Sequence, residues 1–205
     1  MKIDRLELIY FSPTATTKQV LEYIAQGMAS TQVAHVDLTL SQECAQEMGT
    51  GDIALLGVPV YAGRVPLLAA ERLQRVKGQG RPAVVVVVYG NRAYEDALIE
   101  LKDIALDCGF IPVAGGAFIG EHSFATQDTP IANGRPDEAD AAEARSFGVK
   151  IQDILASASG IQDLGSLHVP GNVPYKERPE KKDVAPMADP ELCILCGTCA
   201  ESCPS

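Results

Sequence analysis

Several residue types and patterns are scarce in this chain of 205 residues, and each scarcity excludes a class of protein. Tryptophan is absent and aromatic residues make up only 5% of the chain, so stacking against a flat ligand would fall to tyrosine. The 17 basic residues are outnumbered by 27 acidic ones, for a formal net charge of −10. That balance argues against nucleic acid or an anionic membrane surface as a partner. The longest apolar stretch, residues 82–89, is far shorter than a membrane-spanning helix, so we expect no membrane insertion.

The N-terminus and the cysteines indicate the compartment. Residues 1–5 carry mixed charge and no apolar h-region, so we expect no secretory signal. Of the six cysteines, Cys44 and Cys108 stand alone, whereas the other four fall within the last 13 positions. A secreted disulfide framework would spread its cysteines differently, and we therefore expect a reducing cytoplasm.

Apolar patterns alternate between strand-like and helix-like over the first 158 residues. The pattern predicts strands at residues 3–11, 33–38, 53–60, 83–89 and 110–119, the last one interrupted at Gly115-Gly116. Helical spacing follows each of the first, third, fourth and fifth strands, the last helix running from about residue 136 to 158. Residues 53–60 and 83–89 are continuously apolar, which is typical of strands buried on both faces of a parallel sheet. The sequence therefore predicts an α/β fold with helices on both faces of a parallel sheet.

The composition changes at about residue 160. Residues 169–192 contain five prolines and the charged run 176–182, and no apolar period survives there. We expect an extended linker or a strap that lies on the domain. The predicted division is a folded domain at 1–159, a linker or strap at 160–190 and a cysteine-rich segment at 191–205.

Hydroxyl side chains crowd the turn between the first strand and the first helix. The turn contains Ser12, Thr14, Thr16 and Thr17, with Ala15 among them. Free backbone N–H groups and the positive end of the helix dipole favour an anion at such a position. No lysine lies within the turn, so it suits a monophosphate held by hydrogen bonds. The alternative is an ordinary Ser/Thr-rich turn that caps the helix.

Two further loops follow the third and fourth predicted strands, and parallel strands would bring them to the same edge. Ligands of open α/β sheets bind beyond this edge. Tyrosines offer stacking faces and glycines permit close backbone approach, although tyrosines could also simply cover the strand ends. Together with the hydroxyl-rich turn, the two loops indicate a flavin site, with these candidate residues: Pro59, Val60, Tyr61, Ala62 and Gly63 in the first loop, and Tyr89, Gly90, Asn91, Arg92 and Tyr94 in the second.

The strongest motif is the cysteine spacing at the end of the chain. Cys193, Cys196, Cys199 and Cys203, the last followed by proline, have the spacing that binds a [4Fe–4S] cluster in bacterial ferredoxins. Zinc is the alternative, but four cysteines this close together seldom serve zinc. In two-cluster ferredoxins the fourth cysteine of each run ligates the other cluster, and the sequence has no second run. We expect either a truncated fragment or a cluster that is absent or incomplete in this chain.

Six strings, in this order along the chain, resemble the flavodoxin–ferredoxin fusion proteins (EFR-type ferrodoxins) of anaerobic bacteria: FSPTATT, VPVYAGRVP, VVYGNRAYEDAL, FIGEHSF, VPGNVPYKERP and CILCGTCAESCP. The resemblance covers essentially the whole chain. It implies a flavodoxin-like, doubly wound, five-stranded parallel sheet of order 2-1-3-4-5 with bound FMN. It also implies a small C-terminal ferredoxin-like segment that carries iron–sulfur clusters.

The resemblance also implies roles for individual residues. Ser12, Thr14, Thr16 and Thr17 would hold the FMN phosphate. Residues 59–63 and 89–92 would flank the isoalloxazine ring. The candidate stacking partners are Tyr61, Tyr89 and Tyr94.

Three residues bear on how the flavin would behave. Ala15 stands where flavodoxin phosphate loops usually have glycine, so a positive φ there would strain the alanine and lower FMN affinity. Arg64 and Arg92, if they lie near the ring, would raise the flavin potential; the alternative is that they point to solvent. The long loop at residues 121–135, which begins Glu121-His122-Ser123, could touch flavin or partner as a lid.

These features predict an electron carrier rather than a substrate-converting enzyme. FMN takes up one or two electrons, an iron–sulfur cluster passes one, and a tether raises their effective concentration. The acidic charge would steer basic patches of redox partner proteins. One alternative is an FMN-dependent reductase of a quinone or nitro compound, fed by the cluster. Another is a flavin-free redox-sensing or binding module.

Overall fold

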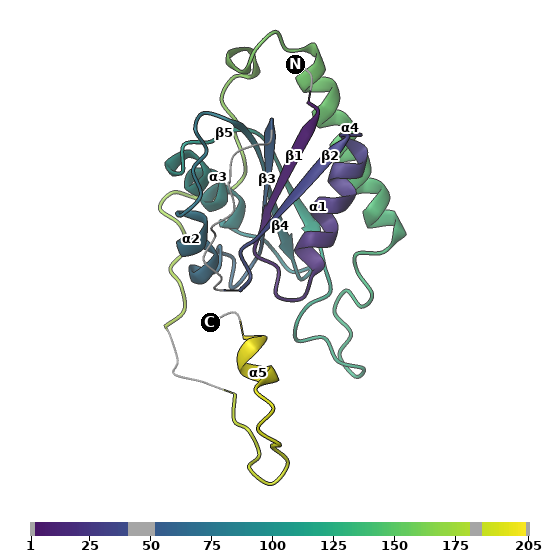
Figure 1. The fold of residues 1–205 in the computed structure, drawn as a ribbon, viewed down its shortest axis with the longest axis vertical. Coiled ribbons are helices and arrows are strands. Elements are labelled where there is room, and N and C mark those ends of the chain that lie inside the picture. Colours follow the sequence, from purple (N-terminus) through teal and green to yellow (C-terminus); the bar gives the residue numbers. More distant parts are fainter. Residues whose placement is uncertain (1–2, 41–51, 181–185, 204–205) are drawn as a thin grey trace.

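The computed structural model describes residues 3–40, 52–180 and 186–203, and its centre is a five-stranded parallel sheet (Figure 1). The strands lie in the order β2-β1-β3-β4-β5, and each neighbouring pair is parallel. This confirms the predicted α/β class and strand order. The strands are β1 (Arg5–Tyr10), β2 (Gln32–Asp37), β3 (Ile53–Pro59), β4 (Pro82–Tyr89) and β5 (Ile111–Ile119).

Helices cover both faces of the sheet and divide the core into two layers. The apolar faces of β3 and β4 are buried on both sides, as their continuous apolar sequences predict. One cluster of buried side chains lies under α2 and α3, and the other lies under α1 and α4. These helices are α1 (Thr16–Gly27), α2 (Leu67–Leu73), α3 (Ala97–Asp107) and α4 (Glu138–Ser157). Because all five strands are parallel, their carboxyl ends lie at the same edge of the sheet, and the loops that follow the strands gather there.

Strand β5 differs from the prediction, because Gly115 and Gly116 do not interrupt it. The strand is continuous, with a single register shift against β4 at Ala83/Val84. A Cβ atom on Gly115 would lie 2.9 Å from the Val169 side chain. The glycine thus makes room for a later segment of the chain to pack against the strand.

That later segment runs along the domain after α4 and the short 3-10 helix η1 (Ile161–Leu164). Leu167 and Val169 pack against the core cluster on the α2/α3 side. From Asn172 onward, hydrogen bonds hold the segment to the domain as far as Arg178. We call residues 167–178 the strap. The division of the chain into three parts at residues 159 and 190 stays a prediction.

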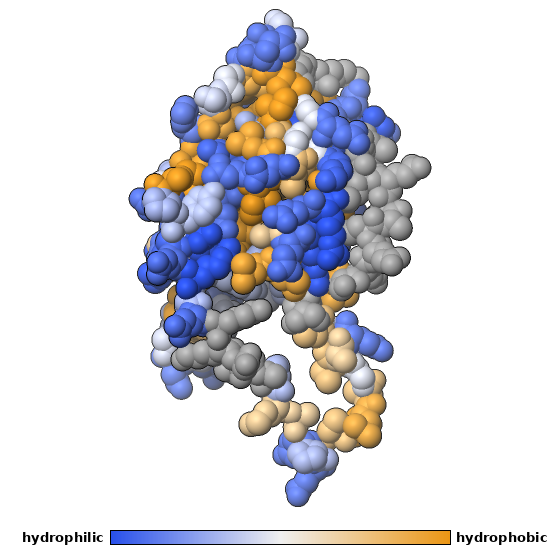
Figure 2. All heavy atoms as spheres, turned by 90° about the vertical axis from the view of Figure 1, so that its left-hand side faces the viewer, coloured by the Kyte–Doolittle hydropathy of each residue, from blue (hydrophilic) through white to orange (hydrophobic). Residues whose placement is uncertain are grey.

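The cysteine-rich segment lies beyond the carboxyl ends of the strands and carries the four-residue helix α5 (Thr198–Glu201) (Figure 1). Figure 2, viewed from the side of α2 and α3, shows hydrophilic side chains over much of that face and apolar ones on the extension below it. The large exposed apolar side chains of this segment are Leu192, Ile194 and Leu195, and Met187 just before it is also exposed. The segment therefore buries little of its own apolar surface.

Candidate functional site

A cleft of about 860 Å³ opens at the carboxyl edge of the sheet. Its size falls within the range of about 300–1,000 Å³ that small-molecule sites occupy. Four loops contribute to its walls, although they are far apart in the sequence. Of the residues predicted to bind a cofactor, these line the cleft: Thr14, Thr16, Thr17, Pro59, Val60, Tyr61, Ala62, Gly63, Tyr89, Gly90 and Arg92.

The other four candidates do not line this cleft but lie next to residues that do. The buried Ser12 hydroxyl accepts a hydrogen bond of 3.1 Å from the backbone N–H of Lys18. Ser12 thereby provides an acceptor for an N–H group in the first turn of α1. Ala15 and Asn91 each occupy the left-handed backbone region, with φ of 61°. The ring of Tyr94 packs edge-on against Tyr89, with 5.5 Å between the ring centroids.

The hydroxyl-rich turn presents donors to one end of the cleft. Ala15 is the residue before the first turn of α1, and its left-handed conformation turns the chain sharply into the helix. The side-chain oxygens of Thr14 and Thr16 lie 3.1 Å apart. The N–H groups in the first turn of a helix have no acceptor within that helix, and the helix dipole is positive there. This end of the cleft therefore fits a phosphate group.

The loop after β3 forms a tight turn at the rim. Tyr61 and Arg64 exchange two backbone hydrogen bonds, of 3.0 and 3.1 Å, across Ala62 and Gly63. Both central residues have positive φ, 52° and 79°, the geometry of a type I′ turn. Tyr61 stays half exposed at the cleft, and partial burial raises the pKa of its phenol. Tyr89 also lines the cleft, so two tyrosines are available there to a planar ligand.

A fourth wall comes from Gly120 to Ala125 together with Arg135. Apart from Gly120, these residues belong to the loop at 121–135 that we expect to touch flavin or partner. A Cβ on Gly90 would lie 2.3 Å from the ring of His122, so only a glycine lets the imidazole lie there. His122 Nδ1 accepts a hydrogen bond of 3.0 Å from the backbone N–H of Phe124, whose side chain is 79% exposed. The Glu121-His122-Ser123 string after β5 could indicate from the sequence that this loop reaches the site. That His122 lies against Gly90 could be seen only in the folded structure, because the two residues belong to different loops.

The two arginines that could lie near the ring or point to solvent behave differently. Arg64 does not line the cleft: its guanidinium donates to Glu100 at 2.7 and 2.9 Å, and its side chain is only 11% exposed. It therefore points neither to the ring nor to solvent, which corrects both expectations for this residue. Arg92 does line the cleft, largely exposed and paired with Glu95. Only one guanidinium of the pair can act on a ligand there.

The four C-terminal cysteines are exposed and not gathered around one point. Among residues 3–40, 52–180 and 186–203, no group of three or more His, Cys, Asp or Glu side chains has the arrangement of a metal site. The Thr198 hydroxyl, 3.4 Å from Cys196 Sγ, lowers the pKa of that thiol. Four cysteine thiolates are the donor set of iron–sulfur clusters, so the residue types present fit that group chemically.

The two isolated cysteines do not join this set. The Cys108 thiol lies 3.3 Å from the carbonyl oxygen of Leu73, and burial raises its pKa. It lies among the residues of the α2/α3 core cluster. Cys44 lies outside the described residues.

The parallel sheet and the edge cleft define a flavodoxin-like fold, and solved structures agree with this class. The chain is similar to a flavodoxin from Archaea, with 17% identity, a TM-score of 0.53 and coverage of 74% of this chain and 99% of that one. It is also similar to oxidised flavodoxin 1 from Bacillus cereus, with 16% identity, a TM-score of 0.53 and coverage of 76% and 99%. An NADH:FMN oxidoreductase in its apo form gives 16% identity, a TM-score of 0.54 and coverage of 76% and 91%. At these identities the likeness establishes the fold.

The C-terminal segment has a family match of its own. The Fer4 family, described as 4Fe-4S binding domain, matches residues 186–205, which include all four late cysteines. No curated protein matches the chain. The described residues contain no helix that is long and apolar enough to cross a membrane. A flavodoxin-like fold joined to a 4Fe-4S binding segment supports a role in electron transfer.

Proposed function

We propose that this chain carries electrons between FMN bound in the cleft and an iron–sulfur cluster bound by Cys193, Cys196, Cys199 and Cys203, and exchanges them with redox partner proteins in the cytoplasm. One observation carries the proposal. The hydroxyl-rich turn and the two tyrosine loops, from separate parts of the chain, converge on a single cleft of cofactor size. The Fer4 match supports a second redox group in the same chain.

The FMN phosphate would be bound without a neutralising cation in the turn itself. The hydroxyls of Thr14 and Thr16, the buried Thr17 and the first-turn N–H groups of α1 are the donors. Lys18, the nearest lysine, reaches Glu22 at 3.9 Å on the helix surface. Hydrogen bonds and the helix dipole would therefore hold the anion.

The isoalloxazine ring would lie between the two loops that carry Tyr61 and Tyr89. Their aromatic faces provide stacking contacts, and the backbone of residues 59–63 and 89–92 provides donors and acceptors for the ring edge. Gly90 and His122 would close the inner side of the cleft. The loop at 121–125 would limit the access of water to the ring.

The tether limits the distance between the two groups. FMN supplies one- and two-electron chemistry, and an iron–sulfur cluster supplies one-electron chemistry. The last anchored residue of the strap, Arg178, lies 15 residues before Cys193. A fully extended chain of that length reaches roughly 50 Å. The cysteines therefore stay within reach of the cleft, and exchange within one chain competes well with exchange between chains.

The proposal is tested by counting cofactors. The chain is purified anaerobically, supplied with FMN, iron and sulfide, desalted, and assayed for flavin and iron per chain. We expect stoichiometric FMN together with bound iron. Cys199→Ser should lose iron and keep FMN, whereas the matched control Cys108→Ser should keep both. A chain that binds iron but stays free of flavin after FMN incubation would instead favour a redox-sensing module.

A second function, reduction of a small molecule by the flavin, is favoured by the loop at 121–125. His122, Ser123 and Phe124 form a cleft wall next to the tyrosine rim, where a quinone or nitro compound could lie. Steady turnover of such a compound by the reduced protein would support the reductase. Single oxidation without turnover, combined with fast electron delivery to a protein acceptor, supports the carrier.

A further inference from the structure

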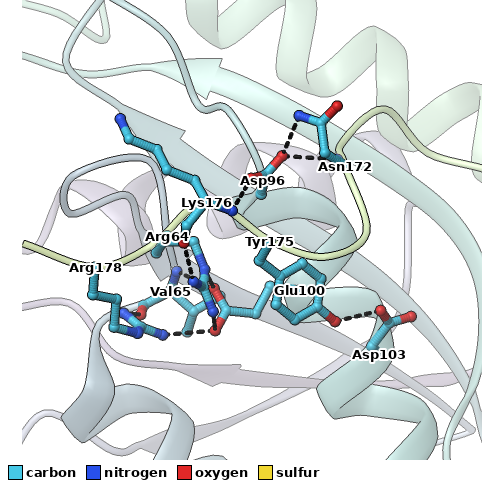
Figure 3. A network of polar contacts seen from close by, with 9 residues as sticks. All are labelled: Arg64, Val65, Asp96, Glu100, Asp103, Asn172, Tyr175, Lys176 and Arg178. Atoms are coloured by element: carbon cyan, nitrogen blue, oxygen red, sulfur yellow. Dashed lines mark hydrogen bonds and ion pairs between the residues drawn. The ribbon is translucent and has the colours of Figure 1, made fainter.

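The C-terminal half of the strap is bound to α3 and to two loops of the cleft through a network of polar contacts that centres on the buried carboxylates of Asp96 and Glu100 (Figure 3). Its N-terminal half is held by apolar contacts of Leu167 and Val169 with the core. Its C-terminal half is held by side chains of α3 and by the loop after β3. The strap is thus packed and hydrogen-bonded as a part of the domain.

Asp96, the residue before the first turn of α3, joins the strap to both tyrosine loops. It is 1% exposed, and its carboxylate accepts hydrogen bonds from the backbone N–H groups of Asn172 and Lys176, at 2.8 and 2.7 Å. The Asn172 side chain adds a third, at 2.9 Å. Asp96 follows the loop at 89–95 directly, and its own N–H donates to the carbonyl of Gly63 at 3.0 Å. One buried residue therefore connects three segments.

Glu100, one turn further along α3, fixes the loop after β3 from the same side. Its carboxylate accepts hydrogen bonds from Arg64, from Arg178 at 2.6 Å and from the backbone N–H of Val65 at 2.8 Å. Arg178 also donates to the backbone carbonyl of Val65, at 2.6 Å. Both polar backbone groups of Val65 are thus held, one by α3 and one by the strap.

A further contact leads from the strap to the cleft wall. The ammonium group of Lys176 pairs with Glu95, and Glu95 also pairs with Arg92, which lines the cleft. The guanidinium of Arg64 lies over the Tyr175 ring, 4.7 Å from its centroid, and donates to the backbone carbonyl of Lys176. Every polar contact of the strap from Asn172 to Arg178 therefore ends on α3 or on a cleft loop, within the described residues.

We propose that the strap is a positioning element of the flavin cleft. It holds the loops at 59–66 and 89–96 in the conformation that faces the ring, with Arg64, Asp96, Glu100 and Arg178 as positioning residues. Docking of the strap and binding of the cofactor are then coupled, and each strengthens the other by the same factor. The identity of the cofactor rests on the proposed function; the coupling between strap and loops does not.

The coupling is tested on the full chain with Arg178→Ala and with the double variant Asn172→Ala/Arg178→Ala. Arg145→Ala is the matched control, because Arg145 pairs with the exposed Glu138 on the opposite helix layer. FMN affinity is measured by titration, and deuterium uptake is measured for peptides of the strap and of the two loops. We expect FMN affinity to fall at least tenfold for Arg178→Ala, further for the double variant, and less than twofold for the control. Uptake should rise in the strap and in both loops together.

The reciprocal effect is measured on the wild-type chain, where FMN should slow deuterium uptake in the strap. The proposal is overturned if uptake rises in the strap while the two loops and the FMN affinity stay unchanged. It is also overturned if the double variant loosens the strap no more than the control does. Should the wild-type chain bind no FMN, the proposed function fails, and loop uptake in the FMN-free variants still decides the coupling.

Discussion

The carboxylate of Glu100 in α3 lies 2.6 Å from the guanidinium of Arg178 in the strap, although 78 residues separate them in the sequence. Arg64 shares the same carboxylate, so one acid faces two guanidiniums with only 7% of its side chain exposed. A buried acid in this position is stabilised because all its partners are in place. Removing the charge of Glu100 therefore leaves the guanidiniums of Arg64 and Arg178 without their counter-charge in a largely buried site.

Glu100→Gln should destabilise the fold by about 3 kcal/mol, because two guanidiniums lose their counter-charge in a buried site. Glu138→Gln is the control, since Glu138 pairs with Arg145 at a position where its side chain is 86% exposed. That exposed pair should contribute less than about 1 kcal/mol. Urea unfolding measures both variants. Equal losses in the two would show that the network around Glu100 contributes no more than a surface pair.

Ala15→Gly should stabilise the chain by about 0.5–1 kcal/mol, because alanine at φ 61° occupies a region that disfavours a Cβ atom. FMN should also bind several-fold more tightly to this variant. The reason is that the ligand-free turn with Ala15 relaxes and must return to the strained left-handed conformation when FMN binds, whereas glycine adopts that conformation without strain. Ala29→Gly is the matched control, since Ala29 also has positive φ, 49°, but lies beyond the other end of α1. It should raise stability and leave FMN affinity unchanged. Equal FMN affinities for the wild-type chain and Ala15→Gly would mean that the turn is already preformed.

Gly90→Ala should lower FMN affinity at least tenfold, or by about 1.4 kcal/mol, because the new Cβ would displace the His122 ring. In the double variant Gly90→Ala/His122→Ala the collision disappears, so part of the affinity should return. Titrations of the two single variants and the double variant complete the cycle. Strict additivity of the two effects would contradict the proposed contact between the loops.

Acid should release the strap. The backbone N–H groups of Lys176 and Asn172 lower the pKa of Asp96, and Lys176 and Arg92 lower that of Glu95. A lowered carboxyl pKa adds stability at pH values above the unfolded pKa of about 4, and this stability is lost as the pH falls through the folded pKa. Strap docking should therefore be constant from pH 7 to about 5 and weaken below about 4.

The absence of tryptophan permits a direct probe of this release. Val173 is exposed in the strap, and Val173→Trp gives a single fluorophore. Its emission should change in the acid range. With Asp96→Asn added, the emission at neutral pH should already resemble the released strap. An acid transition that Asp96→Asn leaves unaltered would assign the release to other groups.

The central part of the fold could be predicted because local patterns determine it. Strands β3 and β4 have no solvent face, so their sequences are continuously apolar, and the parallel arrangement follows from the helices between them. The strand order came from the resemblance to flavodoxin-like chains. The Gly115-Gly116 pair was misleading because the residue that requires the glycine, Val169, comes much later in the sequence.

The site was harder to predict wherever long-range contacts determine the direction of a side chain. Arg64 sits in a loop beside the cleft, and its sequence neighbours do not reveal that Glu100 and Tyr175 hold it on the other side. The wall at 121–125 depends on the absence of a side chain at Gly90. The cysteine spacing is a local pattern that the sequence shows directly, whereas the described residues do not gather the four thiols around one point. The assignment of cofactor-binding residues stays a prediction.

Electron exchange between the two redox groups of one chain is the central claim, and stopped-flow spectroscopy tests it most directly. The reconstituted protein is mixed anaerobically with a reductant that delivers less than one electron per chain, and the flavin and cluster bands are followed over a wide range of protein concentrations. The account predicts redistribution of the electron between flavin and cluster at a first-order rate that is independent of protein concentration. A rate proportional to protein concentration, or no redistribution at all, would contradict it.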